Sequence, residues 1–218
     1  MAANQSFTFG ALDLTLVVTD PPFLENCYII RHRESGDAVV IDPGSAAARI
    51  QDAVTALDAR PLEIWLTHGH PDHLGAVRTL QEAWSVPCRA QAPERPVIEA
   101  APRLAAAFTG ETMQGPSAVE FFSGEPALSA GAISARVIAT PGHTPGGVCY
   151  AFDGFTVTGD TLFRGGVGRT DLPGGDQAAL TASITRMLDG LADGDHLFAG
   201  HGPSWTVADA QQWWRWML

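Results

Sequence analysis

The sequence has no long hydrophobic run. No window reaches about eighteen uninterrupted apolar residues, the length a membrane-spanning helix needs. The first twenty or so residues also lack a basic start followed by an apolar core and a small-residue cleavage site. These absences predict a cytoplasmic protein without a membrane partner.

Basic residues are scarce as well. The chain has 13 Lys plus Arg against 24 Asp plus Glu, a formal net charge of -11. A surface of this sign repels phosphate backbones and anionic lipids, which excludes nucleic acid as an expected partner. A small anionic substrate is not excluded, because bound divalent ions can outweigh nearby carboxylates.

Cysteine is rare, and its pattern does not favour disulfides. Cys27, Cys88 and Cys149 are odd in number, widely spaced and embedded in apolar runs. This pattern predicts reduced thiols inside the core of a protein from a reducing compartment. None lies near a histidine in the sequence, so a nucleophilic role is disfavoured.

With 218 residues and 45% hydrophobic content, the chain can form one domain over residues 1–218. Runs rich in β-formers predict strands at residues 12–18, 27–31, 38–41 and 64–67, then several between 118 and 150, and more at 155–158 and 196–199.

Helical spacing predicts helices at residues 46–57 after an N-cap at Ser45, at 73–84 and at 177–188, with one or two short helices within 91–115. Strands with helices outside them, in two similar halves, predict an α/β fold: an αββα sandwich of two face-to-face sheets.

The last eight residues carry three of the six tryptophans. A helix there would bring Trp213, Trp216 and Met217 onto adjoining faces. We expect this helix to dock on the core, with a dimer contact as the alternative, because large aromatics are enriched at interfaces. The protein is therefore predicted to be a monomer or a homodimer.

The segment from His68 to His73 reads HGHPDH and places four metal-binding side chains within six residues. Imidazole and carboxylate ligands together suit zinc or iron, and a run this short can supply two neighbouring ions. A histidine-rich surface turn would require no further histidines placed beside glycines downstream. The motif therefore favours a two-metal hydrolase site.

Three later motifs each set one further candidate ligand in a Gly- or Pro-rich turn after an apolar run. They are TPGHTPGG around His143, TGDT around Asp160 and AGHGP around His201. Such turns bring ligands to the edge of a rigid sheet. His32 and His196 fall outside these motifs and are interpreted as ordinary polar residues.

The order HGHPDH, PGHTPGG, GDTLF, GHGP, from about Asn26 to Pro203, resembles the metallo-β-lactamase fold superfamily. The stretch GDTLFRGGVGRTDLPGGD resembles its glyoxalase II-like branch, in particular the short single-domain bacterial members. The resemblance implies two divalent metals, with zinc favoured and iron or manganese as alternatives.

The ligand sets implied by this resemblance are filled at every position. His68, His70 and His143 would hold the first metal; Asp72, His73 and His201 would hold the second; Asp160 would bridge both. Asp72 and Asp160 are also the expected catalytic residues, because they hold the ions that activate water.

Four neighbouring residues are weaker candidates. Asp42, at a strand end before Pro43-Gly44, either orients the ligand loop by a hydrogen bond or only forms a turn. Thr67 and Thr144 adjoin ligands and could hold imidazoles. In related enzymes the Gly-Arg-Thr-Asp segment lies beside the metals, so Arg169 either meets an anionic substrate group or pairs with Asp171.

The resemblance implies a hydrolase of small-molecule thioesters such as S-lactoylglutathione. Larger glyoxalase II enzymes have a C-terminal helical region that contacts glutathione, whereas this chain ends seventeen residues after His201, so glutathione specificity stays open. The alternative is a persulfide dioxygenase of the same fold, with one iron held by His68, His143 and Asp160. A metal-storing or scaffold module is disfavoured because no ligand position is lost in the sequence. A β-lactamase or a nuclease would rest on the fold alone, and fold does not fix function.

Overall fold

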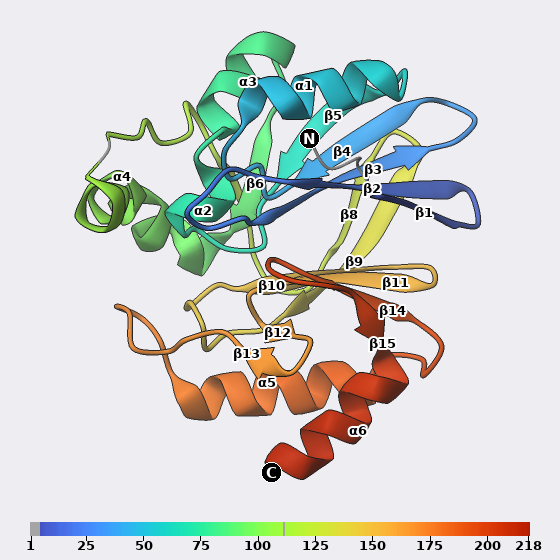
Figure 1. The fold of residues 1–218 in the computed structure, drawn as a ribbon, viewed down its shortest axis with the longest axis vertical. Helices are drawn as coiled ribbons and strands as arrows, with labels where there is room; N and C mark the ends of the chain where they lie inside the picture. The colour runs from blue at the N-terminus through green and yellow to red at the C-terminus, as the bar shows by residue number, and fades with distance from the viewer. Residues whose placement is uncertain (1–4, 111) are drawn as a thin grey trace.

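The computed structural model describes residues 5–110 and 112–218. Two mixed sheets face each other, with helices outside both (Figure 1). The first sheet has seven strands in sequence order: β1 (Gln5–Phe9), β2 (Leu12–Val18), β3 (Asn26–His32), β4 (Asp37–Ile41), β5 (Arg60–Trp65), β6 (Cys88–Gln91) and β7 (Glu120–Phe122). Pairing is antiparallel up to β4 and parallel from β4 to β7.

The second sheet has six strands in the order β15 (Trp205–Thr206), β14 (His196–Ala199), β11 (Phe155–Gly159), β10 (Val148–Phe152), β9 (Ile133–Ala139) and β8 (Ala127–Ala130). Its pairing is antiparallel except for β11 with β14. A small hairpin, β12 (Leu162–Phe163) with β13 (Gly166–Val167), follows β11.

Helices cover the outer face of each sheet. The helices over the first sheet are α1 (Ala47–Ala56), α2 (Pro71–Leu74), α3 (Val77–Trp84) and α4 (Arg95–Thr109), the last preceded by a 3₁₀ turn, η1 (Ala92–Glu94). The helices over the second sheet are α5 (Gln177–Asp189) and α6 (Val207–Met217) (Figure 1). The predicted αββα sandwich is confirmed.

The side chains of the central strands point alternately to the two faces of their sheet and so contribute to two layers of the core. On β3, Tyr28 and Ile30 point between the two sheets, whereas Cys27 and Ile29 point towards the helices of the first sheet. Successive strand side chains face opposite ways, so strands covered on both faces are apolar throughout. A third cluster, which includes Leu180 and Trp214, joins the second sheet to α5 and α6. The three cysteines are buried and free, as predicted.

Two helix predictions were wrong in detail. Ser45 does not cap α1, because its hydroxyl accepts a hydrogen bond from the Asp20 N–H and left-handed Ala46 (φ 59°) precedes the helix. The helix predicted at 73–84 is two helices, since the Ala76 N–H donates to the Pro43 carbonyl at 3.0 Å and leaves the helical ladder. In the 91–115 stretch there is one short turn and one long helix.

The C-terminal helix starts earlier than predicted, and a different tryptophan docks it. Trp214 is buried and donates to the Thr185 hydroxyl at 3.0 Å, which fixes α6 against α5. Trp216 and Met217, which the helical spacing placed on faces adjoining that of Trp213, are exposed. Within the described ranges no helix is long and apolar enough to cross a membrane.

Candidate metal centre

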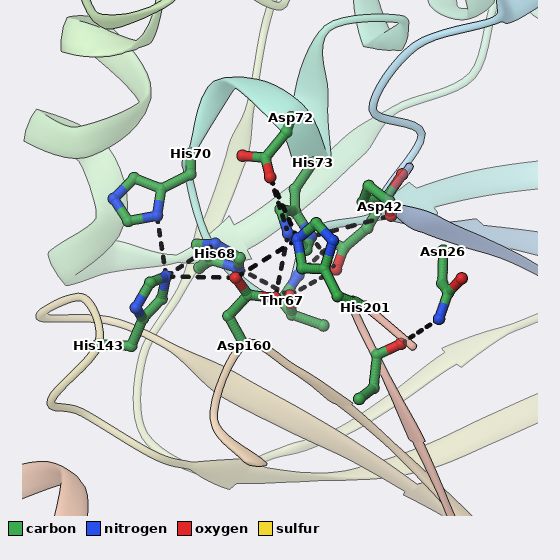
Figure 2. Close-up of polar contacts among 12 residues, drawn as sticks. Asn26, Asp42, Thr67, His68, His70, Asp72, His73, His143, Asp160 and His201 are labelled. Atoms are coloured by element: carbon green, nitrogen blue, oxygen red, sulfur yellow. Dashed lines mark hydrogen bonds and ion pairs between the residues drawn. The ribbon is translucent and has the colours of Figure 1, made fainter. Parts of the chain in front are cut away.

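The seven predicted ligands converge at the carboxyl ends of strands from both sheets (Figure 2). His68, His70, Asp72 and His73 follow β5, His143 follows β9, Asp160 follows β11, and His201 follows β14. Because each loop directly follows a strand that is hydrogen-bonded into one of the two sheets, these side chains are held on a rigid frame.

The first group consists of His68, His70 and His143, all buried. His143 Nε2 lies 2.9 Å from His70 Nδ1 and 3.3 Å from His68 Nε2. His143 Nδ1 lies 2.7 Å from the Arg169 carbonyl, which can only accept, so Nδ1 carries the proton and Nε2 presents a lone pair. Three imidazole nitrogens thus meet at one point.

The second group consists of Asp72, His73 and His201. His201 Nε2 lies 3.2 Å from Asp72 Oδ2, and His73 Nε2 lies 3.7 Å from the same oxygen. Asp160 stands between the groups. Its Oδ1 lies 3.2 Å from His73 Nε2, and its Oδ2 lies 3.7 Å from both His143 Nε2 and His201 Nε2.

The donor set fits a pair of divalent cations. His73 Nε2 and Asp160 Oδ1 are buried, and neither has a well-directed hydrogen-bond partner among the described residues. Lone pairs of imidazoles and carboxylates facing one another at these separations repel unless a proton or a cation lies between them. Imidazole and carboxylate ligands suit zinc, iron and manganese.

Electrostatics distinguish the two groups. Burial lowers the pKa of His68 well below its usual value and that of His70 to about 4, so both imidazoles are neutral at pH 7. Burial would also lower the pKa of His73, but Asp160 and Asp72 raise it well above the usual value. His73 and His201 in turn hold the pKa of Asp72 far below its usual range against the effect of burial. Binding of a cation here would displace the proton from His73.

Asp42 and Thr67 lie behind the imidazoles and orient them. Asp42 Oδ1 accepts from the Thr67 N–H at 2.7 Å, and Oδ2 accepts from the Thr67 hydroxyl at 2.5 Å. Asp42 Oδ2 also lies 3.0 Å from His73 Nδ1, and Thr67 Oγ1 lies 3.1 Å from His68 Nδ1. One carboxylate therefore sets the ring orientation in both groups, which metal-binding histidines generally require.

The other two weaker candidates are placed differently. Thr144 is buried beside the Glu94 carboxylate, and no hydrogen bond joins it to an imidazole among the described residues. The Arg169 guanidinium pairs with Asp171 through two 2.7 Å hydrogen bonds, both side chains being exposed. Its backbone carbonyl, rather than its side chain, contacts His143.

Two buried glutamates beside the ligands were not indicated by any sequence motif. Glu94 is fully buried and accepts from the Gly69 N–H at 2.9 Å and the Gly146 N–H at 2.7 Å, so it ties the loop of His68 to the loop of His143. Glu25 is also fully buried, 3.9 Å from His73 Nδ1, and burial raises its pKa well above the usual value.

The His201 turn is held from β3. Asn26 donates to the carbonyls of Ala199 and Gly202 at 2.9 and 2.8 Å, and Tyr28 donates to the Ala199 carbonyl at 2.6 Å. Gly200 in this turn has to be glycine, because a Cβ there would lie 2.3 Å from Asp160 Oδ1.

Comparison with known proteins agrees with this geometry. The chain is similar to the probable metallo-hydrolase YqgX of Bacillus subtilis (strain 168), 32% identical over 87% of this chain and 90% of that protein. It is also similar to the hydroxyacylglutathione hydrolase GloC of Haemophilus influenzae, 33% identical over 87% of this chain and 91% of that protein.

Among solved structures, that of TTHA1623 in a di-iron-bound form matches with a TM-score of 0.81 and 36% identity, over 89% of this chain and 96% of that chain. Residues 20–209 match the family model of the metallo-beta-lactamase superfamily. The chain belongs to the metallo-beta-lactamase superfamily, whose fold it adopts and whose divalent-metal chemistry its His and Asp cluster fits.

Proposed function

We propose that the protein is a binuclear metal-dependent hydrolase that cleaves thioesters. The observation that carries this proposal is the pairing of two ligand groups through Asp160, whose two oxygens face different histidines. In this proposal His68, His70 and His143 would hold one metal, Asp72, His73 and His201 would hold the other, and Asp160 would be a ligand of both. We propose zinc as the preferred metal and iron or manganese as alternatives. Of these two alternatives, the di-iron-bound form of TTHA1623 supports iron.

Two bound divalent ions would supply a hydroxide at neutral pH and polarise a carbonyl. The chain's own residues do the positioning. Asp42 fixes the ring of His73 directly and that of His68 through Thr67, while Glu94 keeps the two ligand loops together. All three cysteines are buried, and burial raises the pKa of Cys149 to about 11, so a thiolate nucleophile is not available.

A thioester fits such a site because its leaving group is a thiolate, which departs without protonation by a general acid. The site therefore needs no dedicated acid residue for this substrate class. The similarity to GloC supports S-lactoylglutathione as one substrate. We also propose activity on simpler thioesters, by a monomer or homodimer acting in the cytoplasm without membrane or nucleic-acid partners, which agrees with the net charge of -11.

The test is steady-state hydrolysis of S-lactoylglutathione and of a simple thioester by protein of measured metal content. We expect both to be cleaved at neutral pH. Refusal of every thioester by the fully metallated protein would overturn the proposal.

A second candidate function, a mononuclear-iron dioxygenase, is supported by one observation. His68, His143 and Asp160 form a two-histidine, one-carboxylate set, with His143 Nε2 3.3 Å from His68 Nε2 and 3.7 Å from Asp160 Oδ2. A mononuclear-iron persulfide dioxygenase would use that set alone. Iron-dependent oxygen uptake with glutathione persulfide, in the same preparations, would favour it over hydrolysis.

A further inference from the structure

An apolar cavity of about 460 Å³ opens beside His70 of the first ligand group. It lies between α4 and the loop that carries Leu172, Pro173 and Gly174, with Pro145 from the His143 turn completing that wall. In Figure 2, His70 and His143 lie on the side of the site that faces α4, whereas His201 lies on the opposite side. The volume is in the range of sites for small organic ligands.

One face of α4 forms the other wall. Val97, Ala100, Leu104 and Ala107 line the cavity at spacings of three and four residues, which is the repeat of a single helix face. The buried residues Ile98, Ala101 and Ala105 pack a different face into the protein core. The helix is therefore apolar on two faces, one packed against the core and the other lining the cavity.

The opposite wall of the cavity depends on the close packing of Gly174 against Pro145. Gly174 has φ 90°, and a Cβ there would lie 2.7 Å from Pro145 Cγ, so the loop can reach the proline only with glycine at this position. The cavity has one charged lining residue, Arg103, which is exposed and forms no ion pair among the residues the structure describes. An arginine can cover an apolar wall with its methylene stem while its charged end stays in water.

The two cavities beside the second ligand group differ in chemistry. One, of about 310 Å³ beside Asp72, is lined in part by Thr19 and Thr79; the other, of about 490 Å³ beside His201, is lined in part by Asn26. The cavity beside Asp72 therefore offers hydroxyl and carboxylate groups, which suit the polar thiol portion of a thioester, whereas the cavity beside His201 is lined mostly by apolar side chains such as Phe23 and Phe198.

We propose that the cavity between α4 and the Leu172 loop is the subsite for the acyl chain of the substrate, and that it selects thioesters of apolar, medium-length acids. This inference rests on the proposed hydrolase function. Glutathione, with its amides and charges, does not match an apolar lining, whereas a hydrocarbon chain gains free energy with each methylene that it buries there.

The experiment compares N-acetylcysteamine thioesters of acetate, butanoate and hexanoate, which share one leaving group. For the wild type we expect kcat/KM to rise roughly threefold to fourfold for each added methylene. Ala100→Trp fills the cavity and should abolish this gradient, lowering kcat/KM most for the hexanoyl thioester and least for the acetyl thioester, whose acyl group reaches least far into the cavity. Ala106→Trp is the matched control, because Ala106 lies on the same helix, is exposed and does not line the cavity.

A second readout separates this proposal from the hydrolase proposal. Ketone analogues, in which a methylene separates sulfur from the carbonyl, cannot be hydrolysed, and their dissociation constants are measured by calorimetry. A chain-length gradient in binding that Ala100→Trp removes would uphold the subsite even if no thioester were cleaved. Hydrolysis without any gradient, or a gradient lost equally in Ala106→Trp, would overturn the subsite and leave the hydrolase intact. If Ala100→Trp does not fold, Ala107→Trp at the same wall replaces it.

Discussion

Asp42 Oδ2 lies 3.0 Å from Nδ1 of His73, and both side chains are buried. The same oxygen accepts from the Thr67 hydroxyl, whose own oxygen lies beside His68 Nδ1. Asp42 thus orients one imidazole in each group from a single carboxylate. Its backbone is left-handed, with φ 49°, a conformation that Asp and Asn tolerate better than most residues.

Asp42→Asn is expected to lower metal affinity about 10-fold to 100-fold. The amide has the same shape and suits the left-handed backbone, but one of its two terminal groups can only donate, so it cannot accept from Thr67 and His73 as the carboxylate does. The measurement is competition with a chelator, followed by elemental analysis. Asp58→Asn is the matched control, because Asp58 is exposed and also left-handed (φ 48°). Equal affinities in wild type and Asp42→Asn would contradict the orienting role.

Removal of metal is expected to lower the melting temperature. A ligand that binds only the folded state stabilises it by mass action, and seven donors here predict about two ions per chain. Elemental analysis gives the stoichiometry, and thermal unfolding is compared before and after chelation. An unchanged melting temperature after verified metal loss would count against the site, as would an active sample that holds at most one metal and gains nothing from added zinc.

The parts of the site that sequence could predict are those in which chemistry and chain order coincide. His68 to His73 lie in one turn, and His143, Asp160 and His201 each follow a strand, so turn motifs reveal them. Glu94 and Asn26 could not be found this way. Each acts on a loop that is far away in the sequence, and burial against that loop, rather than a local motif, gives it its role.

The fold errors have a similar origin. Helical spacing continues through Gly75 and Ala76, but the Ala76 N–H finds the Pro43 carbonyl, a partner from another loop. On α6, the pattern alone does not distinguish Trp214, which meets Thr185 of α5, from Trp216, which faces solvent. Tertiary contacts determine both the break between α2 and α3 and the tryptophan that docks α6. Local sequence propensity carries no information about such contacts.

The pH dependence of stability should reveal the neutral imidazole of His70. Burial and the neighbouring His143 lower its pKa to about 4, compared with about 6.5 in an unfolded chain. Between these values the unfolded state binds more protons at this position, so stability is lost as pH falls from 6.5 to 4. In metal-free protein, the unfolding free energy of wild type relative to His70→Gln should fall by roughly 1–3 kcal/mol from pH 7 to pH 4. Urea titrations at both pH values measure it; a constant or rising difference would contradict the burial argument.

Arg169 is paired with Asp171 in this structure, and we propose that it exchanges this partner for an anionic substrate group. Arg169→Ala should then raise KM for an anionic thioester more than for a neutral one, without affecting the backbone carbonyl that meets His143. Asp171→Asn, which frees the guanidinium, should lower KM for the anionic substrate. Equal effects on both substrates in both variants would assign the pair a purely structural role.

The final prediction separates the hydrolase from the dioxygenase. His201 belongs to the group of Asp72 and His73, and its Nε2 lies 3.2 Å from Asp72 Oδ2, so its removal disturbs the second group and leaves the side chains of His68, His143 and Asp160 in the chain. His201→Ala should therefore loosen or empty one metal position. A hydrolase that needs both ions should lose on the order of a hundredfold or more in kcat. His32→Ala is the control, since His32 is the last residue of β3, half-buried, and its Nδ1 lies 3.2 Å from the Ser35 hydroxyl rather than beside a ligand.

A dioxygenase with a single iron would respond differently to the same change. Its two histidines and one carboxylate survive in His201→Ala, so iron-dependent oxygen uptake with glutathione persulfide should largely persist. Thioester cleavage, oxygen consumption and the content of iron and zinc are therefore measured together in wild type, His201→Ala and His32→Ala. We expect cleavage by the wild type and the control, weak cleavage by His201→Ala, and no oxygen uptake in any of them. Robust uptake by the wild type that is retained in His201→Ala would overturn the hydrolase proposal, because the second ligand group would then serve no step of the reaction.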